Sequence, residues 1–372
     1  MSDRFDVCVI GGGLAGLSAA AGLAAFMRVV LVEREPQLGY HSTGRSAALF
    51  AESYGNVPVR ALTRASRAFY TADRAAQPFT SARGVLFVGT HAQEAELLGL
   101  QTALADASPN ARLLDAGEAL RLCPALRAKT LSGALLDPDA RDIDVATVVD
   151  HYTRLLRSRD GVILRNAEVR SAWRDSGEWH IVADSNRIHA RVVVNAAGAW
   201  ADELARLAGV APVGLAPKIR TAVCVSAEQW QAADWPCVID ASEQWYFRPT
   251  AGSLLLSPAD ETPSPPCDVQ ADDLSVAVTI DRIETATRIA VSRVIRSWAG
   301  LRTFAADRSP IAGFDRDAPG FFWLAGQGGY GIQTAPALAA LTVALIAERP
   351  MPPSLTDAGV DPAALHPARL PA

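Results

Sequence analysis

The chain has 372 residues, of which 49% are hydrophobic and 20% charged, which is typical of a soluble globular enzyme with two domains. A net charge of −5 argues against a nucleic-acid partner, and the apolar run 337–347 is too short to span a bilayer. Five scattered cysteines without a C-x-x-C spacing, and the absence of a secretory signal, predict a cytoplasmic protein, with peripheral membrane association left open. The six histidines have no metal-ligand spacing, so we expect no metal site.

The first predicted unit is a strand, a glycine turn, a helix and a second strand. Residues 5–10 form a short apolar strand, and Gly11, Gly13 and Gly16 follow it in the G-x-G-x-x-G spacing. An alanine-rich helix is expected from residue 14 to about residue 27, and a strand at 29–32. Such a turn lets backbone N–H groups and the helix N-terminus approach a pyrophosphate, so this order predicts a bound dinucleotide.

The second strand ends at an acidic residue. Glu33 lies 22 residues after Gly11, where a carboxylate would hydrogen-bond a ribose hydroxyl and disfavour a 2′-phosphate. The polar loop Gly39–Ala48 follows, with Ser42, Thr43, Gly44 and Arg45 at its centre. This loop is either an ordinary surface turn or a second wall around a long cofactor, and the second interpretation favours FAD over NAD.

Short elements are expected over the next 150 residues. We expect helices at 57–77, 92–106 and 115–121, and another that begins within 142–147 with an aspartate as its N-cap. Strands are expected at 85–88, 162–164 and 180–183. The next strong pattern is 191–200, where a β-branched strand ends in Asn-Ala-Ala-Gly before a helix that begins at Trp200. In open α/β sheets, ligands bind at such carboxyl ends of strands.

Residues 211–294 change in character, because clustered prolines and short strands, as at 219–225 and 245–248, predict an antiparallel sheet of a second domain. The chain then returns to the first domain. Residues 326–331 contain four glycines and lead into a helix with Pro336 expected in its first turn. This turn is either a plain sheet closure or an anion-stabilising site at the flavin, and the density of glycines favours the second.

These motifs together resemble FAD-dependent amine oxidoreductases of the D-amino-acid oxidase superfamily, and most of all the bacterial D-arginine dehydrogenase type. The most specific stretches are Gly39–Ala48, Trp298–Phe304 and Gln327–Thr334. The resemblance implies an α/β fold with a Rossmann-like FAD-binding domain and an antiparallel-sheet substrate domain. We assign 1–80, 139–215 and 296–372 to the first domain, and 81–138 and 216–295 to the second.

The resemblance also implies the site residues. Arg220 and Arg302 would hold a substrate carboxylate with the hydroxyls of Tyr54 and Tyr246, because a guanidinium binds a carboxylate in one plane. Gln333 and the backbone at Gly329 would hold the amine, and Ser46 and Ala47 would form a mobile loop beside the flavin. The residues expected to bind non-covalent FAD are Gly11, Gly13, Leu14, Ala15, Gly16, Glu33, Arg34, Ser42, Thr43, Gly44, Arg45, Ser46, Ala47, Val169, Ala197, Gly198, Trp200, Arg302, Gly328, Gly329, Tyr330, Gly331, Ile332 and Gln333.

Two positions depart from the arginine-type pattern. Leu49 stands where those enzymes have a histidine, and Gly84 where they have an acid that binds the cationic side chain. A buried cation without a partner is costly, so we expect an apolar or aromatic D-amino acid as substrate. Lys218 is the lysine nearest to the expected site; relatives that use oxygen quickly place a lysine over the flavin, and on resemblance we favour a dehydrogenase.

Several functions stay open. The main expectation is hydride transfer from the α-carbon of a D-amino acid with a free carboxylate to FAD, an EC 1.4-type reaction. The alternatives are an oxidase of glycine, sarcosine or a cyclic imino acid, a 2-hydroxy-acid dehydrogenase, or a flavoprotein subunit that depends on a partner. The electron acceptor, whether a quinone, oxygen or another group, is not specified by any motif.

Overall fold

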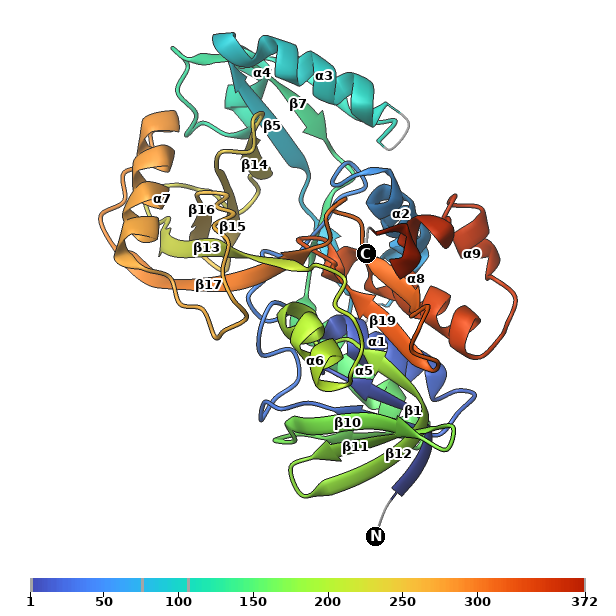
Figure 1. Ribbon diagram of the computed structural model, residues 1–372. Helices are drawn as coiled ribbons and strands as arrows, with labels where there is room; N and C mark the ends of the chain where they lie inside the picture. The colour runs from blue at the N-terminus through green and yellow to red at the C-terminus, as the bar shows by residue number, and fades with distance from the viewer. Residues whose placement is uncertain (1–2, 75–76, 106–107, 371–372) are drawn as a thin grey trace.

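Two eight-stranded sheets dominate the computed structural model, which describes residues 3–74, 77–105 and 108–370 (Figure 1). The first sheet lies at the N-terminal end of the molecule, and the second lies toward α3 and α7. The helices are α1 (Leu14–Leu23), α2 (Val57–Thr71), α3 (Glu94–Leu104), α4 (Ala116–Leu122), α5 (Val145–Ser158), α6 (Ala201–Leu207), α7 (Asp273–Ala286), α8 (Gly331–Ile346) and α9 (Pro353–Thr356). Four 3₁₀ turns are η1 (His91–Gln93), η2 (Gly198–Trp200), η3 (Ala363–Leu365) and η4 (Pro367–Arg369).

The first sheet has a parallel centre. Its main order is β10 (Val169–Asp175), β11 (Glu178–Ala183), β12 (Asn186–Asn195), β1 (Asp3–Ile10), β2 (Val29–Val32) and β9 (Val162–Leu164). β19 (Phe321–Ala325) pairs in parallel with the end of β12, and β18 (Ile311–Phe314) pairs with β19. The carboxyl ends of β1, β2, β12 and β19 therefore meet at one edge, where ligands bind in open α/β sheets.

The second sheet is mostly antiparallel. Its order is β17 (Val294–Phe304), β13 (Ala216–Ser226), β16 (Ser253–Ser257), β15 (Tyr246–Thr250), β14 (Cys237–Asp240), β5 (Val85–Thr90), β7 (Leu131–Asp137) and β6 (Arg112–Asp115). A small third sheet joins β3 (Leu49–Phe50), β8 (Arg141–Ile143) and β4 (Thr80–Ala82). The long ribbon of β13 and β17 runs from the second sheet toward the first (Figure 1).

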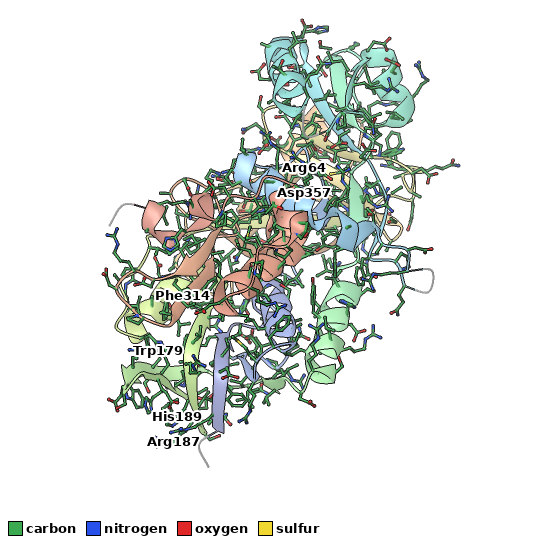
Figure 2. All side chains as sticks on the ribbon, turned by 90° about the vertical axis from the view of Figure 1, so that its right-hand side faces the viewer. Arg64, Trp179, Arg187, His189, Phe314 and Asp357 are labelled. Atoms are coloured by element: carbon green, nitrogen blue, oxygen red, sulfur yellow. The ribbon has the colours of Figure 1, made fainter. Side chains whose placement is uncertain are left out.

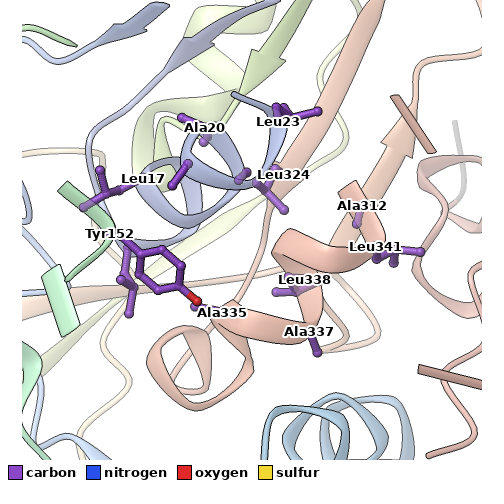
Figure 3. Packing of buried hydrophobic residues seen from close by; sticks show 14 of the residues in the cluster. Leu17, Ala20, Leu23, Tyr152, Ala312, Leu324, Ala335, Ala337, Leu338 and Leu341 are labelled. Carbon is purple, nitrogen blue, oxygen red and sulfur yellow. The ribbon is translucent and has the colours of Figure 1, made fainter. Parts of the chain in front are cut away.

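The core under the first sheet is built by α1 and α8. Figure 3 shows Leu17 and Leu23 of α1 with Leu338 of α8 and Leu324 of β19, and each of these side chains is at most 1% exposed. A Cβ atom added to Gly22 would lie 2.8 Å from a methyl carbon of Val343, so glycine lets the two helices approach closely. α1 is apolar on every side, as expected of a helix that is buried all round.

The C-terminal segment packs against α2 and adds Leu355, Ala358 and Leu365 to the same core. Figure 2 shows Arg64 of α2 beside Asp357, and Arg64 donates a hydrogen bond of 3.4 Å to the carbonyl oxygen of Ala358. The same view places Trp179 and His189 in β11 and β12, at the far end of the first sheet from the helices of the second. None of these residues lines the cavity described below.

The fold class predicted from the sequence is confirmed, and several local predictions are corrected. α7 interrupts the region predicted as sheet alone, with the side chain of Asp272 accepting from the N–H of Ser275 as its N-cap. The helix predicted at 57–77 ends at Thr71, and residues 75–76 lie outside the described residues. The predicted aspartate N-cap is Asp144. Our division of the chain into domain segments stays a prediction, since β17 crosses from one sheet toward the other.

The position of Pro336 was predicted wrongly. α8 begins at Gly331, so Pro336 lies beyond its first turn, where a proline removes the hydrogen bond to the carbonyl four residues earlier. That carbonyl belongs to Ile332, and the hydroxyl of Tyr70 donates to it instead. A side chain from α2 thus satisfies the group that proline leaves free.

We expect Leu338→Ala to lower the free energy of unfolding by about 2–5 kcal/mol, because the side chain is 1% exposed and truncation leaves a cavity in the helix core. Leu274→Ala is the matched control, since Leu274 is 74% exposed and should change stability by less than about 0.5 kcal/mol. Urea unfolding at a fixed FAD concentration measures both. Equal losses would show that the α1–α8 core is not the main source of stability.

Candidate active site

One long cavity lies between the carboxyl edge of the first sheet and the β13–β17 ribbon. One end is formed by the glycine turn after β1 and by the start of α1, including Gly11, Gly13, Leu14 and Ala15. The other end is formed by Arg220, Tyr246 and Arg302 from the second sheet. The remaining predicted residues on its wall are Glu33, Arg34, Ser42, Thr43, Arg45, Ser46, Ala47, Val169, Ala197, Gly198, Trp200, Gly328, Gly329, Gly331 and Ile332.

The glycine turn provides a cradle for a phosphate group. Gly11 has φ of +114°, and a Cβ atom there would lie 2.3 Å from the carbonyl oxygen of Ala196. Gly13 is an extended N-cap of α1 without a capping side chain, so backbone N–H groups at the helix start are available to an anion. The hydroxyl of Thr43 accepts from the N–H of Leu14 at 3.0 Å and ties the 39–48 loop to this turn. The cradle fits the pyrophosphate of a dinucleotide.

The side chain of Glu33 stabilises the same turn through hydrogen bonds. Its carboxylate accepts hydrogen bonds from the backbone N–H groups of Gly12 at 2.6 Å and Glu35 at 2.8 Å. Both carboxylate oxygens are thus oriented by the backbone, and each keeps further acceptor capacity for a ribose hydroxyl. Gly16 does not line the cavity; its Cβ would lie 2.0 Å from the carbonyl oxygen of Gly11, so its role is close packing of helix on turn.

An aromatic and charged cluster forms the rim beyond Glu33. The Arg34 guanidinium lies 3.9 Å from the ring centre of Trp200, and a nitrogen of Arg34 is 3.2 Å from a ring nitrogen of His41. His41 also lies 2.9 Å from the carboxylate of Glu35. His41 lines the cavity, but no sequence motif identifies it as a site residue, because its partners come together only when the loop folds.

The Arg45 side chain joins the cofactor loop to the second sheet. Its guanidinium donates to the carbonyl oxygens of Val269 at 2.8 Å and Ala299 at 3.0 Å, and it pairs with Asp268. These contacts occupy the guanidinium, so its observed role is to hold the 39–48 loop against β17. Gly44, also predicted to bind the cofactor, does not line the cavity and forms a tight backbone turn with Gly39.

Arg302 lines the end of the cavity that the second sheet forms. Among the described residues it has no carboxylate partner within 4.0 Å, and one guanidinium nitrogen donates to the hydroxyl of Tyr54 at 3.2 Å. Burial opposes the charge, but the oxygens of Tyr54 and Tyr246 raise the pKa of Arg302 above its ordinary value. A Cβ atom on Gly329 would lie 2.8 Å from the guanidinium carbon, so glycine is needed there for the arginine to fit.

Arg220 is partly paired. Its Nε donates to the carbonyl oxygen of Asp260 at 2.8 Å, and a terminal nitrogen lies 3.6 Å from the carboxylate of Glu261. Glu261 is shared with Lys218 at 2.9 Å and with Arg308 at 2.7 Å. The hydrogen bonds from Arg308 outweigh partial burial and lower the pKa of Glu261 to about 2, so this carboxylate stays ionised at neutral pH. Lys218 points to this ion pair and does not line the cavity.

Gln333 does not take the predicted place in the site. Its side chain is 2% exposed and does not line the cavity. The amide oxygen accepts from the N–H of Ala51 at 3.2 Å, and the amide nitrogen donates to the hydroxyl of Thr63 at 2.9 Å. Both polar ends of Gln333 are therefore used to join α8 to α2 and to the segment before Tyr54.

Four other positions singled out in the sequence also lie off the cavity wall. Tyr54 and Tyr330 stand behind it, with ring centres 4.9 Å apart, and Tyr54 reaches the site through Arg302. Leu49 is in β3 and packs with Tyr54 in a small apolar cluster. Gly84 lies in a turn with φ of +75°. Neither Leu49 nor Gly84 lines the cavity. The structure therefore does not show that these two residues change the shape or polarity of the substrate pocket.

Metal sites, membrane-spanning helices and cavity cysteines were also sought among the described residues. In the part of the chain that the structure describes, no group of three or more His, Cys, Asp or Glu residues could hold a metal ion. Over the same residues, no helix is long and apolar enough to cross a bilayer. No cysteine is among the described residues that line the long cavity.

Comparisons with known proteins show the family that the chain matches. Residues 6–345 match the family described as DAO, FAD dependent oxidoreductase. The chain is 25% identical over 361 residues to glycine oxidase of Geobacillus kaustophilus (strain HTA426), and the match covers 94% of each chain.

Solved structures show the same fold. The structure of glycine oxidase from Geobacillus kaustophilus superposes with a TM-score of 0.83 at 23% identity over 100% of both chains. L-proline dehydrogenase from P. horikoshii has a TM-score of 0.81 at 20% identity, covering 97% of this chain and 98% of that one. The FAD-bound L-α-glycerophosphate oxidase from Mycoplasma pneumoniae has a TM-score of 0.82 at 18% identity, covering 93% and 95%.

We expect Gly11→Ala to abolish retention of FAD, because the added Cβ would meet the carbonyl oxygen of Ala196 at 2.3 Å and the turn would have to move. Gly177→Ala is the control: Gly177 has φ of +88°, which is equally unfavourable for alanine, but no atom lies within 4 Å of its Cβ position. The FAD-to-protein ratio after purification should fall at least ~10-fold for Gly11→Ala only, consistent with a lost anion cradle. Normal FAD content in Gly11→Ala would contradict this cradle.

Proposed function

This chain belongs to the DAO family of FAD dependent oxidoreductases, with FAD as its cofactor, and we propose that it oxidises the carbon–nitrogen bond of an α-amino acid held by its carboxylate. The observation that carries the proposal is Arg302. A partly buried guanidinium without a carboxylate partner among the described residues, beside a cavity, is a site for a carboxylate ligand.

The residues around Arg302 complete the carboxylate site. Tyr246 lines the cavity from β15, and Tyr54 contacts the guanidinium from the side. Arg220 shares a face with Lys218, whose Cα is opposite that of Arg302 in the β13–β17 register. A planar guanidinium binds a carboxylate through two parallel hydrogen bonds and so fixes the orientation of the α-carbon.

The remaining protein chemistry is positioning and electrostatics. FAD, when bound, supplies the acceptor for the hydride that leaves the α-carbon. The cavity-lining carboxylates are Glu33 after β2, Glu168 before β10 and Glu203 in α6. Among the described lining residues that the second sheet contributes, those that titrate are Arg220, Tyr246 and Arg302. No side chain there is a ready base, so we expect the amine to react in its neutral form. The N-terminus of α8, without a capping side chain, stabilises negative charge at the cavity.

The substrate class has two candidates. The similar proteins glycine oxidase, L-proline dehydrogenase and iminodiacetate oxidase support glycine or a secondary amine as the substrate, and we put this class first. The second candidate is an apolar or aromatic D-amino acid, which rests on the departures from the arginine-type sequence pattern at Leu49 and Gly84 and not on residues of the cavity wall. The resemblance to the D-arginine dehydrogenase type stays a prediction, and the missing acid argues against arginine itself.

The form of the cofactor and its reoxidation are part of the proposal. Since no cysteine lines the described cavity, we propose non-covalent FAD. The ammonium group of Lys218 is held by Glu261 at 2.9 Å and is not on the cavity wall, which supports a dehydrogenase with slow use of oxygen. Hydrogen peroxide formed in step with turnover would instead identify an oxidase.

Anaerobic bleaching of the flavin separates the substrate candidates. We expect rapid bleaching by glycine, sarcosine or proline, or by apolar D-amino acids, and at least ~10-fold slower bleaching by D-arginine, because a cationic side chain would be desolvated without a partner. Matched 2-hydroxy acids are the control for the amine. If they bleach the flavin and the amines do not, the carboxylate site stands and the amine chemistry is wrong.

Arg302→Met should lower kcat/KM by at least ~100-fold, because a charge-assisted bidentate contact to the substrate is lost. Arg302→Lys should recover only part of this loss, since an ammonium group keeps the charge without the planar pair of donors. Arg293→Met, at an exposed position of the second sheet region, is the control for loss of a cation. An unchanged kcat/KM in Arg302→Met would overturn the carboxylate assignment.

A further inference from the structure

We propose that Arg248 is a positioning residue that keeps the Ser46–Ala48 segment, which forms one wall of the FAD cavity, in a single conformation. This inference rests on the FAD cavity described above and adds a residue to it. Ser46 and Ala47 line the cavity. Arg248 does not line it and acts through the backbone of the segment.

The contacts of Arg248 are directed at the segment. Arg248 is two residues after Tyr246 in β15, so the two side chains share one face of the strand. One terminal nitrogen of its guanidinium donates to the carbonyl oxygen of Ala47 and lies 3.5 Å from that of Ala48. The carbonyl of Ala48 also accepts from the N–H of Ile143 at 2.9 Å, which joins the segment to β8.

The segment needs such support because of its backbone conformation. Ala48 has φ of +50°, a region that residues with a Cβ atom rarely adopt. The N–H of Ala48 donates to the hydroxyl of Ser46 at 3.0 Å, a local contact within the segment itself. Contacts from outside the segment must therefore hold the strained residue, and Arg248 and Ile143 provide them.

A buried counter-ion fixes Arg248 in turn. The Asp142 carboxylate lies 3.1 Å from the Arg248 guanidinium and accepts from the Nε of Arg83 at 2.7 Å. The side chains of these three residues are 12–15% exposed, so their ion pairs are shielded from solvent. Asp142 is opposite Leu49 in the β3–β8 register, directly after the segment. The guanidinium is thereby held on one side by charge and on the other by the carbonyls.

Arg83 offers an internal control, because it shares the acid but not the segment. Its guanidinium donates to the carbonyl oxygens of Ala233 at 2.7 Å and Trp235 at 2.9 Å. Removing either arginine leaves Asp142 with one partner. Only removal of Arg248 takes a donor away from the carbonyls of Ala47 and Ala48, and that of Ala48 then keeps only the N–H of Ile143. Both variants therefore remove one cation beside Asp142, but they remove hydrogen-bond donors from different backbone segments.

Hydrogen–deuterium exchange of the FAD-loaded protein tests the proposal without a substrate. In Arg248→Met, amide exchange in peptides covering residues 45–51 should accelerate by at least ~10-fold, since a charge-assisted contact to the backbone is lost. In Arg83→Met, the acceleration should fall on peptides covering 232–237. Arg248→Lys, which keeps a cation near the carbonyls, should restore part of the protection at 45–51.

The kinetic consequence is measured with the amino acid that bleaches the wild-type flavin. We expect Arg248→Met to raise the apparent Kd for that substrate by at least ~5-fold and to alter the limiting reduction rate less, because the wall moves while Arg302 stays in place. Arg83→Met should change neither value. The proposal would be wrong if exchange at residues 45–51 were equally fast in the two variants, or if Arg248→Met did not accelerate it. Faster exchange in Arg248→Met with unchanged kinetics would show that the segment does not affect substrate binding. Failure of all amino acids to bleach the flavin would count against the proposed function and leave the exchange test intact.

Discussion

The pairing of β13 with β17 is the interaction on which the site depends. Both strands have 11 residues, and their register places Lys218 opposite Arg302 and Arg220 opposite Gly300. β17 also meets the cofactor side, because the carbonyl of Leu301 accepts from the hydroxyl of Ser42 at 2.6 Å and that of Thr303 accepts from the N–H of Gly328 at 2.8 Å. One ribbon thus fixes the guanidinium that we propose binds the substrate, that of Arg302, relative to the cofactor loop and to the turn before α8.

The distribution of charge follows from this ribbon. Glu261 neutralises Lys218 and Arg308 and leaves Arg220 a longer contact of 3.6 Å, while Arg302 contacts only tyrosine oxygens among the described residues. A buried cation is costly unless an anion or hydrogen bonds compensate it. The Tyr54 hydroxyl offsets part of this cost at Arg302, and a hydroxyl is a weaker partner for a guanidinium than a carboxylate. A substrate carboxylate can therefore compete for Arg302 more easily than for Arg308.

The sequence predicted the features that depend on short spacings, and not those that depend on distant pairing. The glycine turn, Glu33 and the strand end at Asn195 follow from local patterns, and the cavity lies where they meet. The partners of Arg220 could not be predicted, because Asp260 reaches β13 through a turn about 40 residues away and carries no motif of its own. The family resemblance implied that Gln333 holds the substrate amine. Its side chain points into the α8–α2 contact instead, a direction that helix phase decides once α8 is placed.

β15 links substrate binding to the shape of the cofactor cavity. Tyr246 and Arg248 are two residues apart on the same face, so one strand presents a cavity-lining hydroxyl and the guanidinium that contacts the Ser46–Ala48 segment. A displacement of β15 would move both groups together, since the strand is hydrogen-bonded on both sides, to β14 and to β16. Substitutions in the sheet behind β15 would then change substrate affinity without touching the cavity.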